Sequence, residues 1–364
     1  MKIGIITYHR SVSYGAFLQT YALTRYLSGL GHDVNVIDYN PAHRDDKVRP
    51  WTKRLFGFHP QNIVNSFKYR CFSDYIERYL PLTERSYRTL RELQNEPPTM
   101  DAYICGSDQI WNPTHIGEGF DPAYFNCFGG PHIKRIAYAA SIGSSRLPEK
   151  YNQELCDNVS WLDHLSAREK SACDWITSIT GRQCAHVLDP TFLVSDYSEL
   201  YKTERIIKGP YVLVFSLVDS ALLRDVLQTA KVAIGLPFVF IGSHYKLWKY
   251  RGKCCFCTPG DWLNLYANAK AVITNSFHGT VFSLKFKKPF ISVGLPEWMK
   301  ERNIRMRELF EIVQLSERFV VEDSMVDNAK LIIDNPDWIN IEKCLSIKIT
   351  HSVEFLSKSL VERD

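Results

Sequence analysis

Residues 274–284, with the sequence TNSFHGTVFSL, combine residue types that could hold an anion and move a proton. They follow a short apolar run, AVI, and this pattern predicts a buried strand that leads directly into a helix. The first turn of a helix has unpaired backbone N–H groups and a partial positive charge, which together favour phosphate or carboxylate. His278 would stand within reach of such an anion, able to donate a hydrogen bond or pass a proton near neutral pH.

The neighbours of His278 allow a functional and a structural interpretation. Gly279 would let an anion approach the backbone closely, and the hydroxyls of Ser276 and Thr280 could cap the helix or donate to oxygen atoms. In the structural interpretation, Ser276 is only an N-cap and His278 is a hydrogen-bonded histidine in the wall between two domains. The residues that we expect to bind substrate at this junction are Asn275, Ser276, Phe277, Gly279 and Thr280.

Polar side chains follow expected strands elsewhere in the chain as well. CGSDQIWNP (105–113) comes after one such strand, HVLDPTFL (186–193) places an aspartate after another, and SVSYGAFLQ (11–19) opens the first expected helix. In open α/β sheets, ligands bind beyond the carboxyl ends of the strands, so these loops can converge on one site. The residues that we expect there are Tyr14, Gly15, Gln19, Ser107, Asp108, Gln109 and Asp189.

The elements around these segments alternate between strands and helices. Residues 2–39 form a strand–helix–strand pattern, which is typical of a parallel sheet. The alternation pauses over a polar stretch at 195–209 and restarts with YVLVFSL at 211–217. We therefore expect two consecutive α/β domains with a cleft between them. The expected boundaries are 1–195 for the first domain, with a basic helical insertion at about 41–100, 196–335 for the second domain, and 336–364 for a C-terminal helix.

Composition limits the class of protein. The 364 residues are 45% hydrophobic, which is enough for two packed domains. The formal net charge of +4 is too small to indicate nucleic acid as a partner. The N-terminus MKIGIITYHR does not read as a signal peptide, and no window approaches 18 apolar residues in a row. We expect a cytoplasmic protein with reduced thiols.

Several common cofactor motifs are missing from the sequence. It has no GxxxxGK[ST] phosphate loop and no clean GxGxxG, which argues against nucleotide hydrolysis and dinucleotide redox chemistry. Cys254, Cys255 and Cys257 form a cluster, but no second pair with zinc-ligand spacing follows, and adjacent cysteines rarely bind one metal together. We expect neither a metal nor another cofactor.

Residues 47–73 differ from the rest of the chain because they are basic and aromatic and contain no acid. One interpretation is a solvated helical insertion. The other is a surface that meets anionic lipid or a lipid-linked diphosphate, which would hold the protein at the inner face of the cytoplasmic membrane. The cations of this segment are Lys47, Arg49, Lys53, Arg54, Lys68 and Arg70.

Five segments in order resemble the polysaccharide pyruvyl transferase family: YGAFLQTYAL, CGSDQIWNP, SAREKSA (166–172), VLDPTFL and TNSFHGTVFSL. The resemblance spans roughly residues 3 to 295. It implies two Rossmann-like domains in a GT-B-like arrangement. It also implies transfer of pyruvate from phosphoenolpyruvate onto two hydroxyls of a sugar, which gives a cyclic ketal and free phosphate. Characterised relatives act on galactose or mannosamine residues of surface polysaccharide precursors, some lipid-linked, so the implied partners are phosphoenolpyruvate and a galactoside or related acceptor.

The resemblance also implies roles for single residues. Arg168 takes the position of the family's donor-site arginine, where a guanidinium suits carboxylate or phosphate, and His278 takes that of its histidine. Relatives have an arginine where this chain has Ser276, so either another cation supplies this phosphate clamp or the donor binds differently. They usually have an asparagine where this chain has Ser13, a smaller departure from the family pattern. In this scheme His278 is the candidate acid and Asp108 the candidate base. The same layout would also serve a glycosyltransferase that uses a nucleotide sugar.

Overall fold

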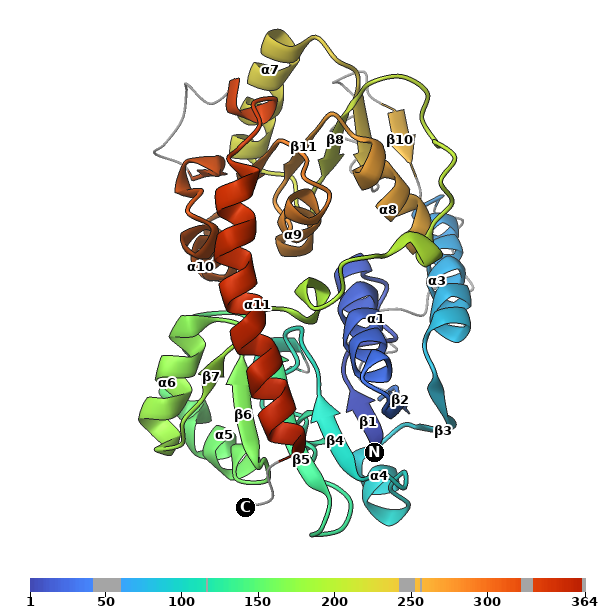
Figure 1. The fold of residues 1–364 in the computed structure, drawn as a ribbon, viewed down its shortest axis with the longest axis vertical. Helices are drawn as coiled ribbons and strands as arrows, with labels where there is room; N and C mark the ends of the chain where they lie inside the picture. Colours follow the sequence, from blue (N-terminus) through green and yellow to red (C-terminus); the bar gives the residue numbers. More distant parts are fainter. Residues whose placement is uncertain (42–59, 116, 242–252, 256, 322–329, 362–364) are drawn as a thin grey trace. The chain divides into compact units, whose positions relative to one another are not determined.

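The computed structural model describes two compact units, each built on a parallel sheet (Figure 1). One unit comprises residues 1–194 together with 348–364, and the other comprises residues 195–347. The described residues are 1–41, 60–115, 117–241, 253–255, 257–321 and 330–361.

The first unit holds seven parallel strands among its described residues. They are β1 Lys2–Ile6, β2 Asp33–Tyr39, β3 Leu82–Tyr87, β4 Ala102–Cys105, β5 Lys134–Ala140, β6 His164–Ala167 and β7 Ala185–His186. Their order in the sheet is β3-β2-β1-β4-β5-β6-β7. The chain thus builds outward in one direction from β1 and in the other from β4. Loops diverge at such a reversal of strand order and leave room for a ligand at the carboxyl ends of the two strands.

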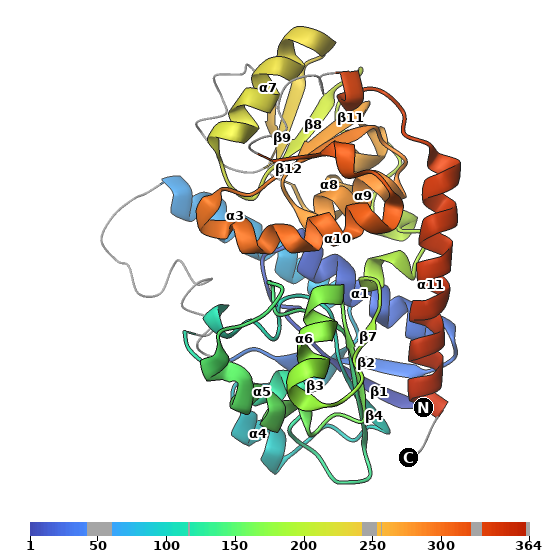
Figure 2. The ribbon, with the colours of Figure 1, turned by 90° about the vertical axis from the view of Figure 1, so that its left-hand side faces the viewer.

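Helices cover both faces of this sheet. Alternate strand residues such as Ile5 and Ile104 pack against Leu23 of one helix and Leu356 of another, while Leu165 on the opposite face packs against two further helices. Figure 2 shows the two pairs on opposite sides of the strands. The first pair is α1 Tyr14–Gly29 and α11 Trp338–Val361, and the second is α5 Asn152–Val159 and α6 Lys170–Thr180.

The second unit holds six parallel strands among its described residues. They are β8 Val212–Phe215, β9 Phe238–Ile241, β10 Lys253–Cys255, β11 Ala271–Thr274, β12 Phe290–Val293 and β13 Phe319–Val320, in the order β10-β9-β8-β11-β12-β13. The direction of building reverses between β8 and β11. One face packs against α7 Ala221–Ile234, and the other packs against α8 Pro259–Asn268, α9 Phe277–Lys285 and α10 Ile304–Val313.

Some elements were not expected from the sequence. Strand β3 has the sequence LTERSY, in which only Tyr87 is buried, so it lacks the apolar run that marks a core strand. Strands β10 and β13 are very short, and β6 lies inside the segment WLDHLSARE. The described part of the expected insertion holds α3 Pro60–Tyr79, β3 and α4 Leu90–Asn95.

The C-terminal helix α11 has residues in both units, because the first unit includes the chain again from residue 348. Leu356 and Leu360 pack into the core of the first unit, and the hydroxyl of Ser352 accepts a hydrogen bond from the backbone N–H of Leu188. This contact joins the two stretches of chain, 1–194 and 348–364, that make up the first unit. Short 3₁₀ helices complete the described chain at Pro113–His115, Pro122–Phe125, Glu149–Tyr151, Pro190–Phe192, Ser198–Leu200, Glu297–Asn303, Ser316–Arg318 and Lys330–Ile332.

Candidate active site

The junction between β11 and α9 lies where the strand order of the second unit reverses. Strand β11 ends at Thr274, and Ser276 still has an extended backbone immediately before the first helical residue, Phe277. The Ser276 hydroxyl accepts a hydrogen bond from the Gly279 backbone N–H at 3.3 Å, so it is the N-cap of α9. The N-terminus of α9, with its partial positive charge, therefore lies at this carboxyl edge.

His278 is the second residue of α9 and is partly exposed, whereas the side chains around it are buried. Its ring meets that of Phe277 edge to face, with 5.2 Å between the ring centroids. Asn275, Ser276 and Thr280 are all less than 5% exposed. Of the residues expected at this junction, His278 is thus the one that is partly exposed, although its Nε2 atom is buried.

Asn275 and Thr280 hold the loops of the junction in place. The Asn275 side chain accepts a hydrogen bond from the backbone N–H of Leu217 and donates one to the carbonyl of Val218, each at 2.7 Å. These two bonds tie the loop after β8 to the end of β11. The Thr280 hydroxyl shares a 2.6 Å hydrogen bond with Ser292 of β12. Both side chains form their hydrogen bonds inside the unit, where they hold the loops at the carboxyl ends of the strands in place.

Gly279 has a packing reason to be glycine. A Cβ atom at this position would lie 2.2 Å from the Thr274 hydroxyl oxygen and 3.0 Å from the Tyr266 hydroxyl oxygen. Contacts this short do not occur, so a side chain would push α9 away from β11 and α8. Gly279 therefore permits the close approach of helix and strand. The sequence analysis had explained this glycine by the approach of an anion.

Asp108 lies just beyond β4, beside the reversal of strand order in the first unit. It is partly exposed and has a backbone φ of 83°, in the left-handed region that residues other than glycine rarely adopt. One of its carboxylate oxygens accepts a hydrogen bond from the backbone N–H of Gln109 at 2.8 Å. Strained, polar residues at such positions cluster at functional sites, which supports the choice of Asp108 as a candidate base.

Arg168 is buried among carboxylates in the first unit. Its Nε donates to Glu169 and its Nη1 donates to Asp189, each at 3.0 Å, and the Ser107 hydroxyl also donates to Asp189. Burial lowers the pKa of Arg168, but Glu169, Asp189 and Asp108 raise it by more, so the guanidinium is held charged. The structure thus brings Arg168 together with Ser107, Asp108 and Asp189, the three residues whose loops the sequence analysis expected to converge. The role of Arg168 in binding a donor stays a prediction.

The remaining residues expected in the first unit are also buried. The Gln19 amide donates to the Thr7 hydroxyl at 3.0 Å, and that hydroxyl donates to the carbonyl of Ser107, so Gln19 braces the end of β4 through β1. Tyr14 packs against Phe72, with 5.1 Å between the ring centroids. Gly15, which follows it in α1, is buried.

Gln109 lies in a tight loop. Its side-chain oxygen accepts a hydrogen bond from Asn112 at 3.0 Å. A Cβ atom at Gly143, whose φ is 79°, would lie 2.3 Å from this oxygen. Gln109 is 7% exposed, and its visible role is to pack the loop after β4 against the loop after β5.

Sequence analysis missed a charged cluster at the carboxyl end of β1. His9 Nε2 lies 3.0 Å from the Asp38 carboxylate, and Arg10 donates two hydrogen bonds to the same group at 2.8 and 2.7 Å. Burial raises the pKa of Asp38, but the hydrogen bonds from His9 and Arg10 outweigh it and hold that pKa well below its usual range. The signal for this cluster was the pair His9 and Arg10, immediately after the predicted strand KIGIITY (2–8).

Within the described residues, no group of three or more His, Cys, Asp or Glu side chains could hold a metal ion. The side chains of Cys254 and Cys255 lie outside the description, and Cys257 is buried. No helix in the described ranges is long and apolar enough to cross a membrane.

Comparisons with known proteins give a family and a fold. A family model described as polysaccharide pyruvyl transferase matches residues 14–295, a range that contains Asp108, Arg168 and His278. A comparison with curated proteins gives no match.

Solved structures of the same fold cover almost the whole chain. UGT89C1 from Arabidopsis thaliana, complexed with UDP-L-rhamnose, is 12% identical with a TM-score of 0.52, over 99% of this chain and 98% of that one. UDP-GlcNAc 2-epimerase from Neisseria meningitidis, bound to UDP-GlcNAc, is 10% identical with a TM-score of 0.51, over 100% of both chains. MnaA from S. aureus with UDP is 12% identical with a TM-score of 0.52, over 100% and 98%. These likenesses and the two parallel sheets confirm two Rossmann-like domains of the GT-B kind.

Proposed function

Because the chain belongs to the polysaccharide pyruvyl transferase family, we propose that it moves pyruvate from phosphoenolpyruvate onto two hydroxyls of a sugar. The sugar belongs to a cell-surface polysaccharide or to its lipid-linked precursor, with a galactoside or related residue as acceptor. The observation that carries the proposal is the position of His278. It is a partly exposed histidine in the first turn of α9, at the reversal of strand order in the second unit.

The N-terminus of α9 suits one anionic end of the donor. Phosphoenolpyruvate carries a phosphate and a carboxylate, and both are favoured by the positive end of a helix. Ser276 holds the backbone of the first turn in place, so that His278 projects from a rigid element. Arg168 is the proposed partner of the other anionic group, as its family position implies. Relatives have an arginine where this chain has Ser276, so the phosphate has one cation fewer at this position.

The reaction needs a proton donor and a proton acceptor but no redox step. A proton is added to the methylene carbon of phosphoenolpyruvate while one sugar hydroxyl attacks C2. Phosphate then leaves C2, and a second hydroxyl closes the ring. One donor and one diol thus give one ketal and one phosphate, and the protons of the two hydroxyls balance those taken up by carbon and phosphate. We assign His278 as the acid and Asp108 as the base for an acceptor hydroxyl. This scheme uses no metal or cofactor.

The location belongs to the proposal as well. We place the enzyme in the cytoplasm, with peripheral contact between residues 47–73 and an anionic membrane surface. Residues 47–59 lie outside the described part of the chain, while in α3 Arg70 is exposed and the Lys68 ammonium lies 5.9 Å from the centre of the Tyr14 ring. Replacing the cations of residues 47–54 with serine should weaken binding to anionic vesicles. Unchanged binding would leave the solvated insertion as the interpretation.

A thermal-shift experiment tests the donor directly. Phosphoenolpyruvate should raise the melting temperature of the wild-type protein, since a ligand that binds only the folded state stabilises it. The same ligand should raise the melting temperature of the His278→Asn variant less, while the melting temperature without ligand stays the same. Stabilisation by a nucleoside diphosphate but not by phosphoenolpyruvate would overturn the proposal in favour of a glycosyltransferase that uses a nucleotide sugar.

A further inference from the structure

Two lysines meet at the amino-terminal edge of the sheet in the second unit, the edge opposite to His278. Strands β11 and β12 pair in parallel with Val272 beside Phe290. Lys270 and Lys288 each lie two residues before one of these partners, so they take corresponding positions on neighbouring chain segments. The backbone N–H of Lys270 is bonded to the carbonyl of Tyr211, which fixes this edge beside β8.

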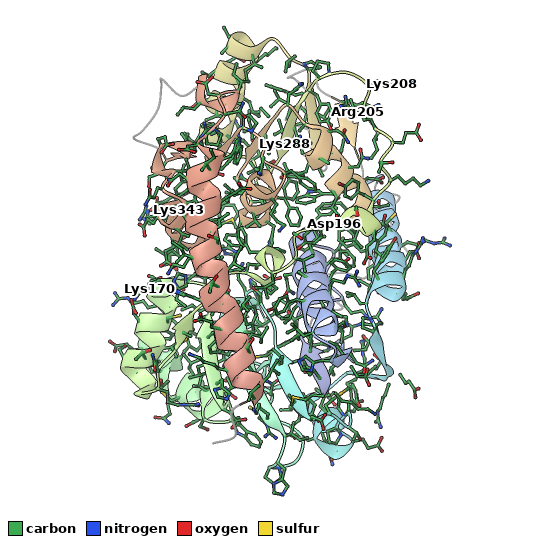
Figure 3. The ribbon with its side chains drawn as sticks, viewed as in Figure 1. Lys170, Asp196, Arg205, Lys208, Lys288 and Lys343 are labelled. Atoms are coloured by element: carbon green, nitrogen blue, oxygen red, sulfur yellow. The ribbon has the colours of Figure 1, made fainter. Side chains whose placement is uncertain are left out.

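A third cation is brought to the same place by a distant segment. Asn264 of α8 is 2% exposed, and its side chain donates to the carbonyls of Lys202 and Glu204 at 2.6 and 2.8 Å. It also accepts a hydrogen bond from the backbone N–H of Ile206 at 3.3 Å. These three bonds from one buried amide fix the backbone on both sides of Arg205. Figure 3 labels Arg205 and Lys288 on the same part of the unit.

Lys270 and Arg205 both lie close enough to Lys288 to repel its charge. Burial lowers the pKa of the half-buried Lys288, and the charges of Lys270 and Arg205 lower it further. Within the described chain, no carboxylate forms an ion pair with any of the three, although Lys287 next to them pairs with Glu342. The C-terminal ends of α8 and α9 each favour one cation, which accounts for the two lysines. The helix ends do not account for Arg205, whose backbone is held by the three hydrogen bonds of the Asn264 side chain.

We propose that Arg205, Lys270 and Lys288 form a binding site for a phosphate group that carries two negative charges. A guanidinium and two ammonium groups supply several hydrogen-bond donors to phosphate oxygens, and an anion between them would relieve their repulsion. The site is separate from the proposed donor site, since it lies at the amino ends of the strands. Its ligand is either free phosphate or the phosphomonoester headgroup of a lipid.

Titration of the lysine side chains by nuclear magnetic resonance, with inorganic phosphate as the probe, tests the site. Phosphate should shift the Lys288 signal and raise the pKa of Lys288, because the anion favours the charged ammonium. The variant Arg205→Gln/Lys270→Gln should weaken the phosphate dependence of this signal by about tenfold for each cation removed. The matched variant for this double change is Lys231→Gln/Arg307→Gln, and for the triple change below it also carries Lys343→Gln. Each loses exposed cations elsewhere in the unit and should respond as the wild type does.

A second arm separates the two sources of phosphate. Flotation with vesicles of phosphatidylcholine, with or without phosphatidic acid, compares Arg205→Gln/Lys270→Gln/Lys288→Gln with the matched variant, each with residues 47–54 intact. A response to free phosphate indicates a solution ligand, and loss of vesicle binding in the first variant alone indicates a lipid headgroup. An unmoved Lys288 signal together with equal vesicle binding by both variants would overturn the proposal. Phosphate release from phosphoenolpyruvate by the same variants reports on the donor site independently.

Discussion

Among the residues predicted for the site, His278 and Asp108 share a combination that the others lack. Both are partly exposed, and each follows a strand at which the order of its sheet reverses. Asp108 also has a strained backbone. The buried residues around them, such as Asn275 and Gln19, use their polar atoms to hold loops in place. Chemistry is therefore expected from the two exposed side chains and positioning from the buried ones.

Replacement of Arg168 should lower the stability of the fold as well as any binding of the donor. Its guanidinium is 3% exposed and pairs with Glu169 and Asp189, so Arg168→Ala leaves two buried carboxylates without their cation. Loss of one partner of a buried ion pair lowers the free energy of unfolding by about 3–5 kcal/mol. Urea denaturation measures this loss, with Lys170→Ala, an exposed neighbour, as the control. Wild-type stability in Arg168→Ala would show that the pairing is not needed for folding.

Gly279→Ala should destabilise the second unit by overpacking. The added Cβ atom meets Thr274 and Tyr266 at the distances given above, and neither group lies at the end of a flexible chain. Such strain lowers the free energy of unfolding by about 1–3 kcal/mol. Gly130→Ala is the control, because nothing lies within 4 Å of the new atom there. Equal melting temperatures for the two variants would contradict the packing role of Gly279.

Asp38 should make the free energy of unfolding depend on pH in the acidic range. Its pKa is depressed in the folded state by His9 and Arg10, while an unfolded aspartate has a pKa of about 3.9. The stabilisation is therefore fully present above the unfolded value and is lost as the pH falls from there towards the folded value. Urea denaturation from about pH 6 to pH 3 should show this slope in the wild type and a shallower one in Asp38→Asn. Asp33→Asn, at the exposed start of the same strand, should keep the full slope.

At the scale of elements, the loops at the two reversals of strand order are held by side chains from other elements. Asn275 bonds the loop after β8, and Gln19 of α1 braces the end of β4. This bracing is what keeps a partly exposed histidine or aspartate in one geometry, as a catalytic site requires.

Asn275→Ala should loosen the loop after β8. The change removes the hydrogen bonds to the N–H of Leu217 and the carbonyl of Val218, each of which contributes about 0.5–1.5 kcal/mol. Hydrogen exchange at the Leu217 amide should become faster than in the wild type. Asn268→Ala is the control, because its side chain bonds only to Asn264 within α8. Unchanged exchange at Leu217 in Asn275→Ala would contradict the bracing role.

The elements that the sequence predicted are those with a clear period or an apolar run. The strand–helix alternation of residues 2–39 and the junction at 271–285 were confirmed to within a few residues. Strand β3 was not predicted because its residues are largely exposed, and β13 was not predicted because it is two residues long. Local pattern carries no signal for strands of this kind, which depend on pairing with a neighbour.

The candidate site was predictable in place but not in detail. The carboxyl-end rule predicted that Ser107 and Asp108 would lie near Asp189, which belongs to a distant segment. It gave no sign that Arg168 would be enclosed by Glu169 and Asp189, because burial depends on packing between segments that are far apart in the sequence. The sequence likewise marked Gly279 as special, and only the contacts of the folded unit gave the reason.

At the scale of the whole molecule, the family match and the two parallel sheets place the chain among polysaccharide pyruvyl transferases with a GT-B fold. Each unit contributes one candidate chemical group, Asp108 in the first and His278 in the second. Their loops sit at the reversals of strand order, where α/β folds bind ligands. Pyruvyl transfer by a histidine at a helix N-terminus is the account that follows.

Product formation tests this account most directly. The wild-type protein is incubated with phosphoenolpyruvate and a panel of galactosides and mannosamine-containing acceptors, and both released phosphate and the mass of the acceptor are measured. We predict phosphate release together with a mass gain that matches a pyruvate ketal. We further predict that His278→Asn lowers turnover by about 10²–10⁴-fold without a change in melting temperature. A wild-type protein that forms neither product across the panel, or a His278→Asn variant that turns over at the wild-type rate, would contradict it.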